Sequence, residues 1–311
     1  MIQPLGYWLF NRTASFFPDP ARGISLMNWG FSVAGVIVFY YAARALVGER
    51  MARLGSAVYA TVFYAWFSGD VHSTYASQLL APVLVFELLL LHLREPRLRY
   101  LIGASVAFGL GAGFRPTEGA FVGFMFVYYL LRRASRKHAA ISFSLAALVC
   151  LGWLVPTALC YRRRGGIGQV WPYLASVTTQ ASILAHGPTR NTIANMVRFS
   201  VALVFALGPL LPCTLSTCRD LRRPEVVLLW LWIIPGALFR VLSYMSDAPY
   251  LDFITAAVLL LALLGLRGST RKRRAVLLGS CLAWYLVFFL FFRPVLVRSR
   301  PFAVIDVYAG R

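Results

Sequence analysis

Acidic residues and lysine are scarce in this chain. It carries 11 Asp and Glu against 31 Lys and Arg, a net charge of +20 at pH 7, and its only lysines are Lys137 and Lys272. A basic surplus of this size can indicate nucleic-acid binding, but here the arginines stand in short segments between long apolar runs. That placement is typical of the loops of a membrane protein. We therefore expect no nucleic-acid partner.

Cysteine patterns that would hold a disulfide framework or a zinc ion are also missing. The five cysteines lie in or at the ends of apolar runs, with no CxxC spacing and no nearby Cys/His ligand set. Disulfide scaffolds and structural zinc sites need such spacings. The sequence therefore identifies no cofactor, and it does not decide whether the protein requires a divalent metal ion.

Apolar residues fill most of the remaining sequence. Hydrophobic residues make up 59% of the chain, and the mean hydropathy is +0.68. Runs of about 20 apolar residues, the length of a membrane-spanning helix, recur throughout. In lipid a helix satisfies its own backbone hydrogen bonds. The sequence therefore predicts an all-α, polytopic integral membrane protein that forms a single transmembrane domain over residues 1–311, surrounded by membrane lipids.

We expect about ten transmembrane helices and one N-terminal interfacial helix. The interfacial helix falls within residues 1–20, where an apolar, aromatic run ends at Pro18. Six spans follow within residues 24–161, at 24–47, 54–67, 74–93, 100–114, 119–131 and 138–161. Residues 162–192 form a long outer loop. Four spans lie within 193–297, at 193–218, 226–244, 250–266 and 275–297, and residues 298–311 form an outer tail.

Charge predicts the orientation of these spans. Every second connection is basic, namely 48–53, 94–99, 132–137, 219–223 and 267–274. The connections between them carry few excess cations, apart from Arg162–Arg164 at the start of the long loop. The positive-inside rule places the basic set in the cytoplasm. We therefore predict a multi-pass protein of the inner (plasma) membrane whose other face is periplasmic or extracellular.

Polar groups suited to chemistry gather on that non-cytoplasmic face. They are the acids Asp70, Glu118, Asp247 and Asp252, the histidines His72 and His186, the arginines Arg115, Arg198, Arg240 and Arg293, and the aromatic residues Trp171 and Tyr173. The cytoplasmic connections hold no carboxylate/histidine group. Glu87, an acid inside the span 74–93, lies near His92 and Arg94, which favours structural pairing over a role in a proton relay. The outer face is therefore the predicted site for an anionic, membrane-borne substrate.

One segment, Gly109–Gly119, joins two apolar runs and contains Arg115, Pro116 and Glu118. Proline disfavours helical backbone in the residue before it, so the chain should break near Arg115. A cation and a carboxylate at a membrane helix end are costly unless they have partners or a task. Two interpretations stay open: a polar hairpin whose arginine snorkels to the headgroups, and a functional site.

The functional interpretation assigns a role to each group. Arg115, Arg198 and Arg240 would bind the phosphate of a lipid-linked sugar. Asp70 or Glu118 would be the catalytic carboxylate that takes a proton from an acceptor hydroxyl. His72, Trp171 and Tyr173 would contact the sugar or the acceptor, which can be a lipid, a glycan or a protein. Together these groups suit glycosyl transfer from a polyprenyl-phosphate-linked sugar.

Four stretches carry a resemblance to a known family. Gln3–Trp8 resembles an "HPPLYY" or "KPxxGYW" segment, and Arg44–Gly48 with Ala52–Gly55 resembles an "R.L.G…A" turn. Ser73–Leu91 resembles a span with an outer acidic position, and Gly109–Pro116 resembles "GLAAGFRP". The chain thus resembles the GT-C superfamily of membrane glycosyltransferases, in the branch similar to dolichyl-phosphate-mannose–protein mannosyltransferases and to bacterial lipid A sugar transferases.

The resemblance implies a GT-C-like helical fold, a polyprenyl-phosphate donor and a glycosyltransferase activity. It places Gln3 at the donor phosphate, where the family has His or Lys. Family members carry a further span and an outer loop before this segment, and an Asp of that loop is the presumed catalytic base. Relative to that pattern, we expect either an N-terminally truncated chain or a protein without the family's catalytic base. In both cases the remaining candidate acids are Asp70 and Glu118.

Two other functions fit the same composition. A transporter or flippase for a lipid-linked saccharide would need the arginine-rich site but no catalytic base. Transporters commonly show internal repeats and polar sites at mid-membrane, whereas this sequence shows no internal repeat and gathers its polar groups at one face. A membrane scaffold without chemistry would not be stabilised by polyprenyl phosphate. The enzyme is the leading prediction, and the transporter is its alternative.

Overall fold

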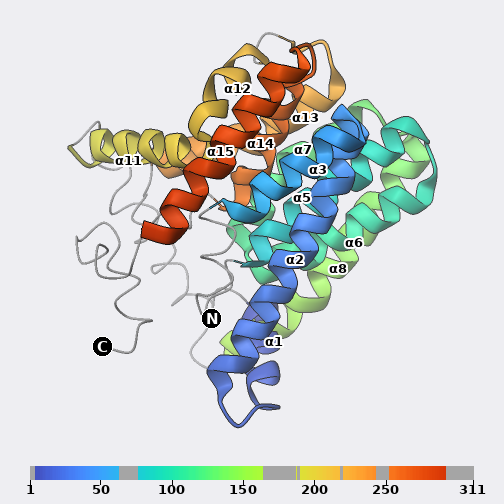
Figure 1. Cartoon of the computed structure of the whole chain (residues 1–311). Helices are drawn as coiled ribbons and strands as arrows, with labels where there is room; N and C mark the ends of the chain where they lie inside the picture. The colour runs from blue at the N-terminus through green and yellow to red at the C-terminus, as the bar shows by residue number, and fades with distance from the viewer. Residues whose placement is uncertain are drawn as a thin grey trace.

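The computed structural model describes residues 4–62, 76–163, 187, 190–217, 220–242 and 252–291. Every regular element in these ranges is a helix, which confirms the all-α prediction (Figure 1). The helices are α1 (Pro4–Ala14), α2 (Pro20–Val47), α3 (Glu49–Thr61), α5 (Ser77–Arg94), α6 (Leu98–Phe114), α7 (Pro116–Arg132), α8 (Arg136–Arg163), α11 (Arg190–Leu207), the 3-10 helix η3 (Gly208–Leu210), α12 (Leu211–Thr217), α13 (Pro224–Leu242), α14 (Asp252–Leu266) and α15 (Arg271–Phe291).

Within the described residues, five segments are long and apolar enough to cross a membrane. They are Pro20–Val47, Ser77–Arg94, Arg136–Cys160, Thr192–Thr217 and Pro224–Leu242. Three shorter apolar helices, Leu98–Phe114, Gly119–Arg132 and Asp252–Leu266, stand beside them. The membrane class is therefore confirmed, while the total of about ten spans and the interfacial location of α1 stay predictions.

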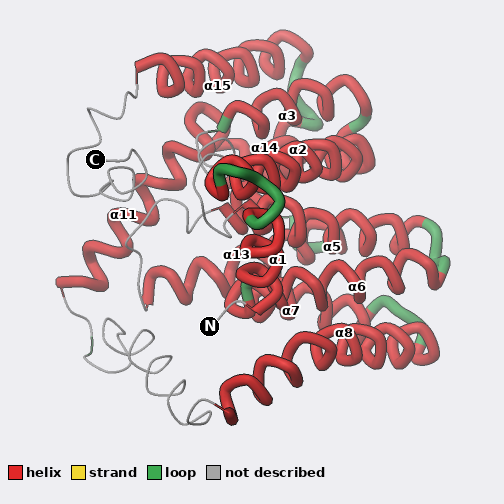
Figure 2. The backbone as a smooth tube through the Cα atoms, turned by 90° about the horizontal axis from the view of Figure 1, so that it is seen from below, coloured by secondary structure: helices red, strands yellow, loops and turns green. Residues whose placement is uncertain are grey.

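Neighbouring helices run side by side in a row of α2, α5, α6 and α8 (Figures 1 and 2). Behind this row, α7 packs against α6 and α13, and α13 packs against α14. Helix α14 is the centre of the bundle, because every one of its residues except Gly265 is buried. A helix that is apolar on all sides is expected at such a position.

Two basic connections are shorter than the sequence indicated. Helix α3 begins at Glu49, so that Gly48 alone, with φ of +84°, separates it from α2. Helix α15 begins at Arg271, inside the expected loop 267–274. Arg, Lys and Glu are good helix formers, and Glu49 forms an ion pair with Arg53 one turn later. Charged residues that indicate a connection between spans can therefore also form the first turn of the next helix.

The seventh expected span, 193–218, is an apolar segment but not one helix. It breaks at η3, where Gly208 has φ of +48° and where Pro209 and Pro212 lack N–H groups. Helix α15 supplies donors at this break: Cys281 Sγ donates to the carbonyl of Leu207 at 3.3 Å, and the Tyr285 hydroxyl donates to that of Ala206. In lipid, freed carbonyls need such partners. The break lets α11 leave the bundle sideways (Figure 1).

Contacts between helix ends fix the two ends of the bundle. At the basic end, Arg94 donates to the carbonyl of Ala45, and His92 contacts Tyr129 and His138. At the opposite end, the Tyr59 hydroxyl donates to the carbonyl of Leu79 at 3.2 Å, which joins α3 to α5. Arg115 follows α6 at this second end, as the alternation of charged connections predicts.

Candidate active site at the α6–α7 break

The backbone between α6 and α7 is interrupted at one residue. Helix α6 ends at Phe114, α7 begins at Pro116, and Arg115 between them has extended backbone with φ of −144° and ψ of 93°. Proline at the first position of a helix loses no hydrogen bond, because that N–H has no partner inside the helix. The predicted break near Arg115 is confirmed.

The Arg115 side chain is held by a neighbouring helix. It is only 7% exposed, and it lies against Gln78 in the first turn of α5. With its amide oxygen toward the guanidinium, Gln78 accepts hydrogen bonds from Arg115 Nε at 2.7 Å and from Nη1 at 3.3 Å. The opposite orientation would place the amide NH2 group of Gln78 against the N–H groups of the Arg115 guanidinium, so that two donors would face each other. Burial and a fixed partner favour a functional arginine over one that snorkels to the headgroups.

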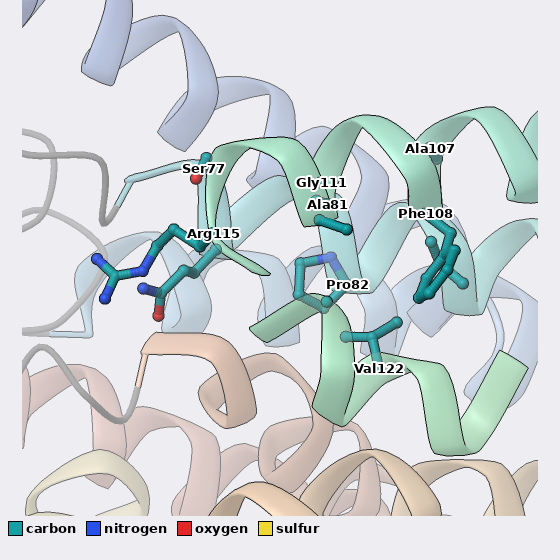
Figure 3. A pocket seen from close by; sticks show the side chains of 12 residues that line it. Ser77, Ala81, Pro82, Ala107, Phe108, Gly111, Arg115 and Val122 are labelled. Atoms are coloured by element: carbon teal, nitrogen blue, oxygen red, sulfur yellow. The ribbon is translucent and has the colours of Figure 1, made fainter. Parts of the chain in front are cut away.

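A pocket between α5, α6 and α7 begins beside this pair. Its lining comprises Ser77, Gln78, Ala81, Pro82, Val85, Ala107, Phe108, Gly111, Ala112, Arg115, Gly119 and Val122. Figure 3 shows Ser77 and Arg115 at one end, Ala107 and Phe108 at the other, and Pro82 between them. The guanidinium is directed away from Phe108 (Figure 3). The pocket is narrow, with a volume of about 20 Å³. Its polarity, a cationic end next to an apolar wall, is therefore the feature that suits an amphiphile with an anionic head, rather than its size.

Three glycines of the segment before Arg115 allow close helix packing around α6. A Cβ atom added at Gly109 would lie 2.7 Å from Val149 Cβ on α8, and one at Gly111 would lie 2.8 Å from Ala81 Cβ on α5. A Cβ atom at Gly113 would lie 2.3 Å from the side chain of Leu5 on α1. Small residues permit such approaches between membrane helices. These contacts fix the end of α6 that carries Arg115.

Arg240 lies at the same end of the bundle as Arg115. It is in the last turn of α13 and is 5% exposed. The ring of its neighbour Phe239 is 5.2 Å from that of Phe121, near the start of α7, and Phe121 is 5.5 Å from Phe253 at the start of α14. The structure therefore brings the start of α7, the end of α13 and the start of α14 together.

Two polar residues at this end were given no role by the sequence analysis. Gln78 contacts Arg115 directly, and Asp252, the first residue of α14, is fully buried. The Asp252 carboxylate acts electrostatically on the hydroxyl of Tyr59 in α3. The sequence placed Asp252 on the correct face, but a glutamine in the first turn of a span carries no signal of its own.

The structure describes only some of the remaining predicted site residues. Arg198 lies on an exposed part of α11 and does not line the Arg115 pocket. Glu118 belongs to the first turn of α7, but its side chain is outside the described part of the structure. Gln3, Asp70, His72, Trp171 and Tyr173 also fall outside the described residues. Their roles stay predictions.

A metal site would need several ligands close together. Among the residues that the structure describes, no three His, Cys, Asp or Glu side chains form such a group. Because Asp70 and the Glu118 side chain lie outside those residues, a metal requirement at the site stays open.

Glu87 lies near the basic end of α5, away from Arg115. It is 7% exposed, and Arg94 and Arg44 act on its charge. One turn further along, His92 Nδ1 is 2.7 Å from the Tyr129 hydroxyl, and its Nε2 is 3.5 Å from His138 Nδ1. Among the described residues Glu87 forms no hydrogen bond or ion pair, and its Oε2 is buried without a partner, so structural pairing of Glu87 stays a prediction.

Comparison with solved structures shows the fold. Over 99% of this chain, ArnT from Cupriavidus metallidurans bound to undecaprenyl phosphate aligns with a TM-score of 0.62 and 16% identity, and 64% of ArnT is covered. The apo state of ArnT aligns over 89% of this chain and 51% of ArnT, with a TM-score of 0.61 and 16% identity.

The archaeal oligosaccharyltransferase AglB from Archaeoglobus fulgidus, in complex with an inhibitory peptide and a dolichol-phosphate, has the same core fold. It aligns over 98% of this chain and 47% of its own, with a TM-score of 0.54 and 15% identity. This chain therefore spans about half to two thirds of the length of these proteins. At these identities the likeness concerns the fold.

Sequence comparison gives the family. No curated protein sequence matches the chain. The family model described as dolichyl-phosphate-mannose-protein mannosyltransferase matches residues 3–160, the part that contains the Gln78–Arg115 pair. Because this match covers half of the 311 residues and the fold agrees with it, the chain belongs to the dolichyl-phosphate-mannose-protein mannosyltransferase family of GT-C membrane glycosyltransferases.

Proposed function

We propose that this protein is a membrane glycosyltransferase that moves a sugar from a polyprenyl-phosphate donor to an acceptor on the non-cytoplasmic face. The observation that carries the proposal is the buried Arg115, fixed by Gln78 at the cationic end of a largely apolar pocket. Two structures of similar fold support it, since ArnT was solved with undecaprenyl phosphate and AglB with a dolichol-phosphate.

In the proposed reaction, the acceptor hydroxyl attacks the anomeric carbon of the donor sugar. A new bond forms between the acceptor oxygen and this carbon, and the bond from the carbon to the phosphate oxygen breaks. Polyprenyl phosphate leaves with additional negative charge, and a guanidinium beside it stabilises that charge as it grows. Arg115 is the group that we assign to this role.

The other predicted residues complete the proposal. Arg240 is the second donor-phosphate ligand, because it lies buried at the same end of the bundle as Arg115. Arg198, on an exposed part of α11, and Gln3 are the further phosphate ligands of this proposal. Asp70 or Glu118 accepts the proton of the attacking hydroxyl. His72, Trp171 and Tyr173 contact the sugar or the acceptor.

The proposed location is the inner or plasma membrane, with the active end periplasmic or extracellular. The bundle supports this location, because the end that joins Ala45 to Arg94 carries the basic connections and Arg115 lies at the opposite end. Cytoplasmic loops carry the excess of arginine and lysine in membrane proteins.

The test compares the wild type with Arg115→Ala and with Arg222→Ala, a control that removes an exposed arginine at the basic end. Full-length protein in lipid nanodiscs is assayed for two quantities: binding of undecaprenyl phosphate, and transfer of a radiolabelled sugar from polyprenyl-phosphate donors. We expect Arg115→Ala to lose at least about 100-fold in transfer, since charge-assisted contacts to phosphate stabilise the transition state, while Arg222→Ala retains wild-type rates.

Three outcomes separate the alternatives. Wild-type turnover in Arg115→Ala, with normal expression, would refute the assignment of Arg115. Binding of undecaprenyl phosphate without any transfer by the wild type would favour the transporter. The absence of both binding and transfer would favour a scaffold.

A further inference from the structure

A second pocket lies at the basic end of the bundle, far along the chain from Arg115. It is an open crevice between the η3–α12 turn and the first two turns of α15, with a volume of about 410 Å³. Pro209, Pro212 and Leu277 contribute to its apolar wall, and Thr270, Lys272 and Arg273 form its polar rim. None of these residues belongs to the site described above.

The broken span creates this crevice. Cys281 and Tyr285 attach the middle of α15 to the carbonyls before η3. The first two turns of α15 lie beyond these attachments, and the proline-containing turn does not fill the space in front of them. Val276, which lines the crevice, is 57% exposed. In a membrane protein, an exposed apolar wall of this kind faces lipid.

The rim is strongly cationic. Residues 267–274 contain five arginines and lysines and no acid. Arg274 is bound to the carbonyls of Ser269 and Arg267 at 2.8 and 2.9 Å, which closes the turn before α15. Lys272 and Arg273 instead line the crevice, and no salt bridge in the described part of the chain engages either of them. The rim is therefore suited to an anion.

We infer that this crevice binds an anionic phospholipid from the membrane leaflet on the basic side of the protein. Lys272 and Arg273 contact the headgroup phosphate, the Thr270 hydroxyl donates to it, and an acyl chain lies along Pro209, Pro212 and Leu277. Basic pockets between membrane helices on the cytoplasmic side are suited to such headgroups. A free phosphate ion would use the rim but leave the apolar wall exposed, so a lipid matches more of the surface.

The binding test uses the full-length, delipidated protein in detergent. Cardiolipin, phosphatidylglycerol and phosphatidylcholine are titrated separately, and bound lipid is counted by native mass spectrometry. The test variant is Lys272→Ala with Arg273→Ala. The matched control is Arg136→Ala with Lys137→Ala, which removes the same two charges from exposed residues at the first turn of α8.

We expect the wild type to prefer the anionic lipids over phosphatidylcholine. The crevice variant should lose about tenfold or more in affinity for them, while the control should lose less than about twofold, because only the first pair lines the apolar crevice. A third variant, Val276→Trp, places bulk against the wall without removing charge and should also weaken lipid binding.

Three results would overturn the inference. The first is an equal effect of the two double variants, which would indicate unspecific attraction by surface charge. The second is full competition by inorganic phosphate, which would assign the rim to a free anion. The third is a concentration-dependent dimer that is lost in Val276→Trp, which would assign the crevice to a second copy of the chain.

Discussion

The amide oxygen of Gln78 lies 2.7 Å from Nε of Arg115 and orients a guanidinium that the α6–α7 break would otherwise leave at a helix end. Two features of the sequence meet in this contact. The first turn of α5 supplies the acceptor, and the proline that starts α7 gives Arg115 its extended backbone. The pair explains how an arginine can be both buried and directed away from the apolar part of the pocket (Figure 3).

Gln78 should influence donor binding through Arg115. Gln78→Ala removes the acceptor, so we expect the KM for the polyprenyl-phosphate donor to rise by about tenfold, because a guanidinium that has lost this acceptor is less well oriented for the donor phosphate. Gln78→Glu keeps an acceptor but adds a negative charge that competes with the phosphate. It should raise the KM more than Gln78→Ala does, while the protein remains at least as stable.

Steady-state kinetics with varied donor concentration, together with thermal unfolding of each variant, would check this order. A KM of Gln78→Glu at or below that of Gln78→Ala would show that Gln78 does not act through the charge of Arg115. A purely structural role would lower stability in both variants without separating their KM values.

Arg115→Lys tests whether charge alone is sufficient. Lysine keeps the cation but lacks the planar guanidinium that binds a phosphate through two parallel hydrogen bonds. We expect transfer to fall by about 10- to 100-fold, less than in Arg115→Ala. Measured transfer rates at saturating donor would provide the comparison. Equal rates for Arg115→Lys and the wild type would mean that the site needs only a positive charge.

Gly111→Ala, a change in α6, should disturb the contact between Gln78 and Arg115. The added Cβ would lie 2.8 Å from Ala81 Cβ, so α6 must move away from α5, which carries Gln78. Overpacking of this kind costs about 1–3 kcal/mol. We expect a lower unfolding temperature and weaker binding of undecaprenyl phosphate.

The matched control for Gly111→Ala is Gly123→Ala in α7. There the nearest atoms, on the Phe108 ring, would be 3.7 Å from the new Cβ, an ordinary contact. If both alanine variants unfold at the same temperature and bind undecaprenyl phosphate equally, the close α5–α6 approach is not what positions Arg115.

Sequence reasoning succeeded where a local pattern carries the information. The Arg115-Pro116 step predicted the helix break, and alternating basic connections predicted which helix ends share a face. Sequence reasoning did not find Gln78, because its contact with Arg115 depends on how α5 packs against α6. A single polar residue in an apolar run gives no indication of its partner.

The broken span illustrates a different limit. Gly208, Pro209 and Pro212 were visible in the sequence, yet hydropathy averaged over a span conceals a backbone interruption. The break is sustained by donors from α15, which is distant in sequence. Likewise, the basic connections before α3 and α15 were predicted as loops because charge was used to mark turns, although these residues favour helix.

The crossing of α12 over the central helix α14 gives a last prediction. A Cβ at Gly265 would lie 2.2 Å from the carbonyl oxygen of Cys213, a backbone atom that cannot move aside as a side chain could. The Thr217 hydroxyl binds the carbonyl of Leu261 at 3.0 Å across the same crossing. Gly265→Ala must therefore separate the helices, and we expect it to destabilise the fold by about 1–3 kcal/mol or more.

Gly279→Ala in α15 is the control for this crossing, because a Cβ there would meet no atom within 4 Å. Alanine favours helix over glycine by about 1 kcal/mol, so this variant should be neutral or slightly stabilising. Thermal unfolding in detergent, followed by loss of the monodisperse peak in size-exclusion chromatography, would compare the two. Equal unfolding temperatures would show that α12 does not cross α14 as closely as the structure indicates.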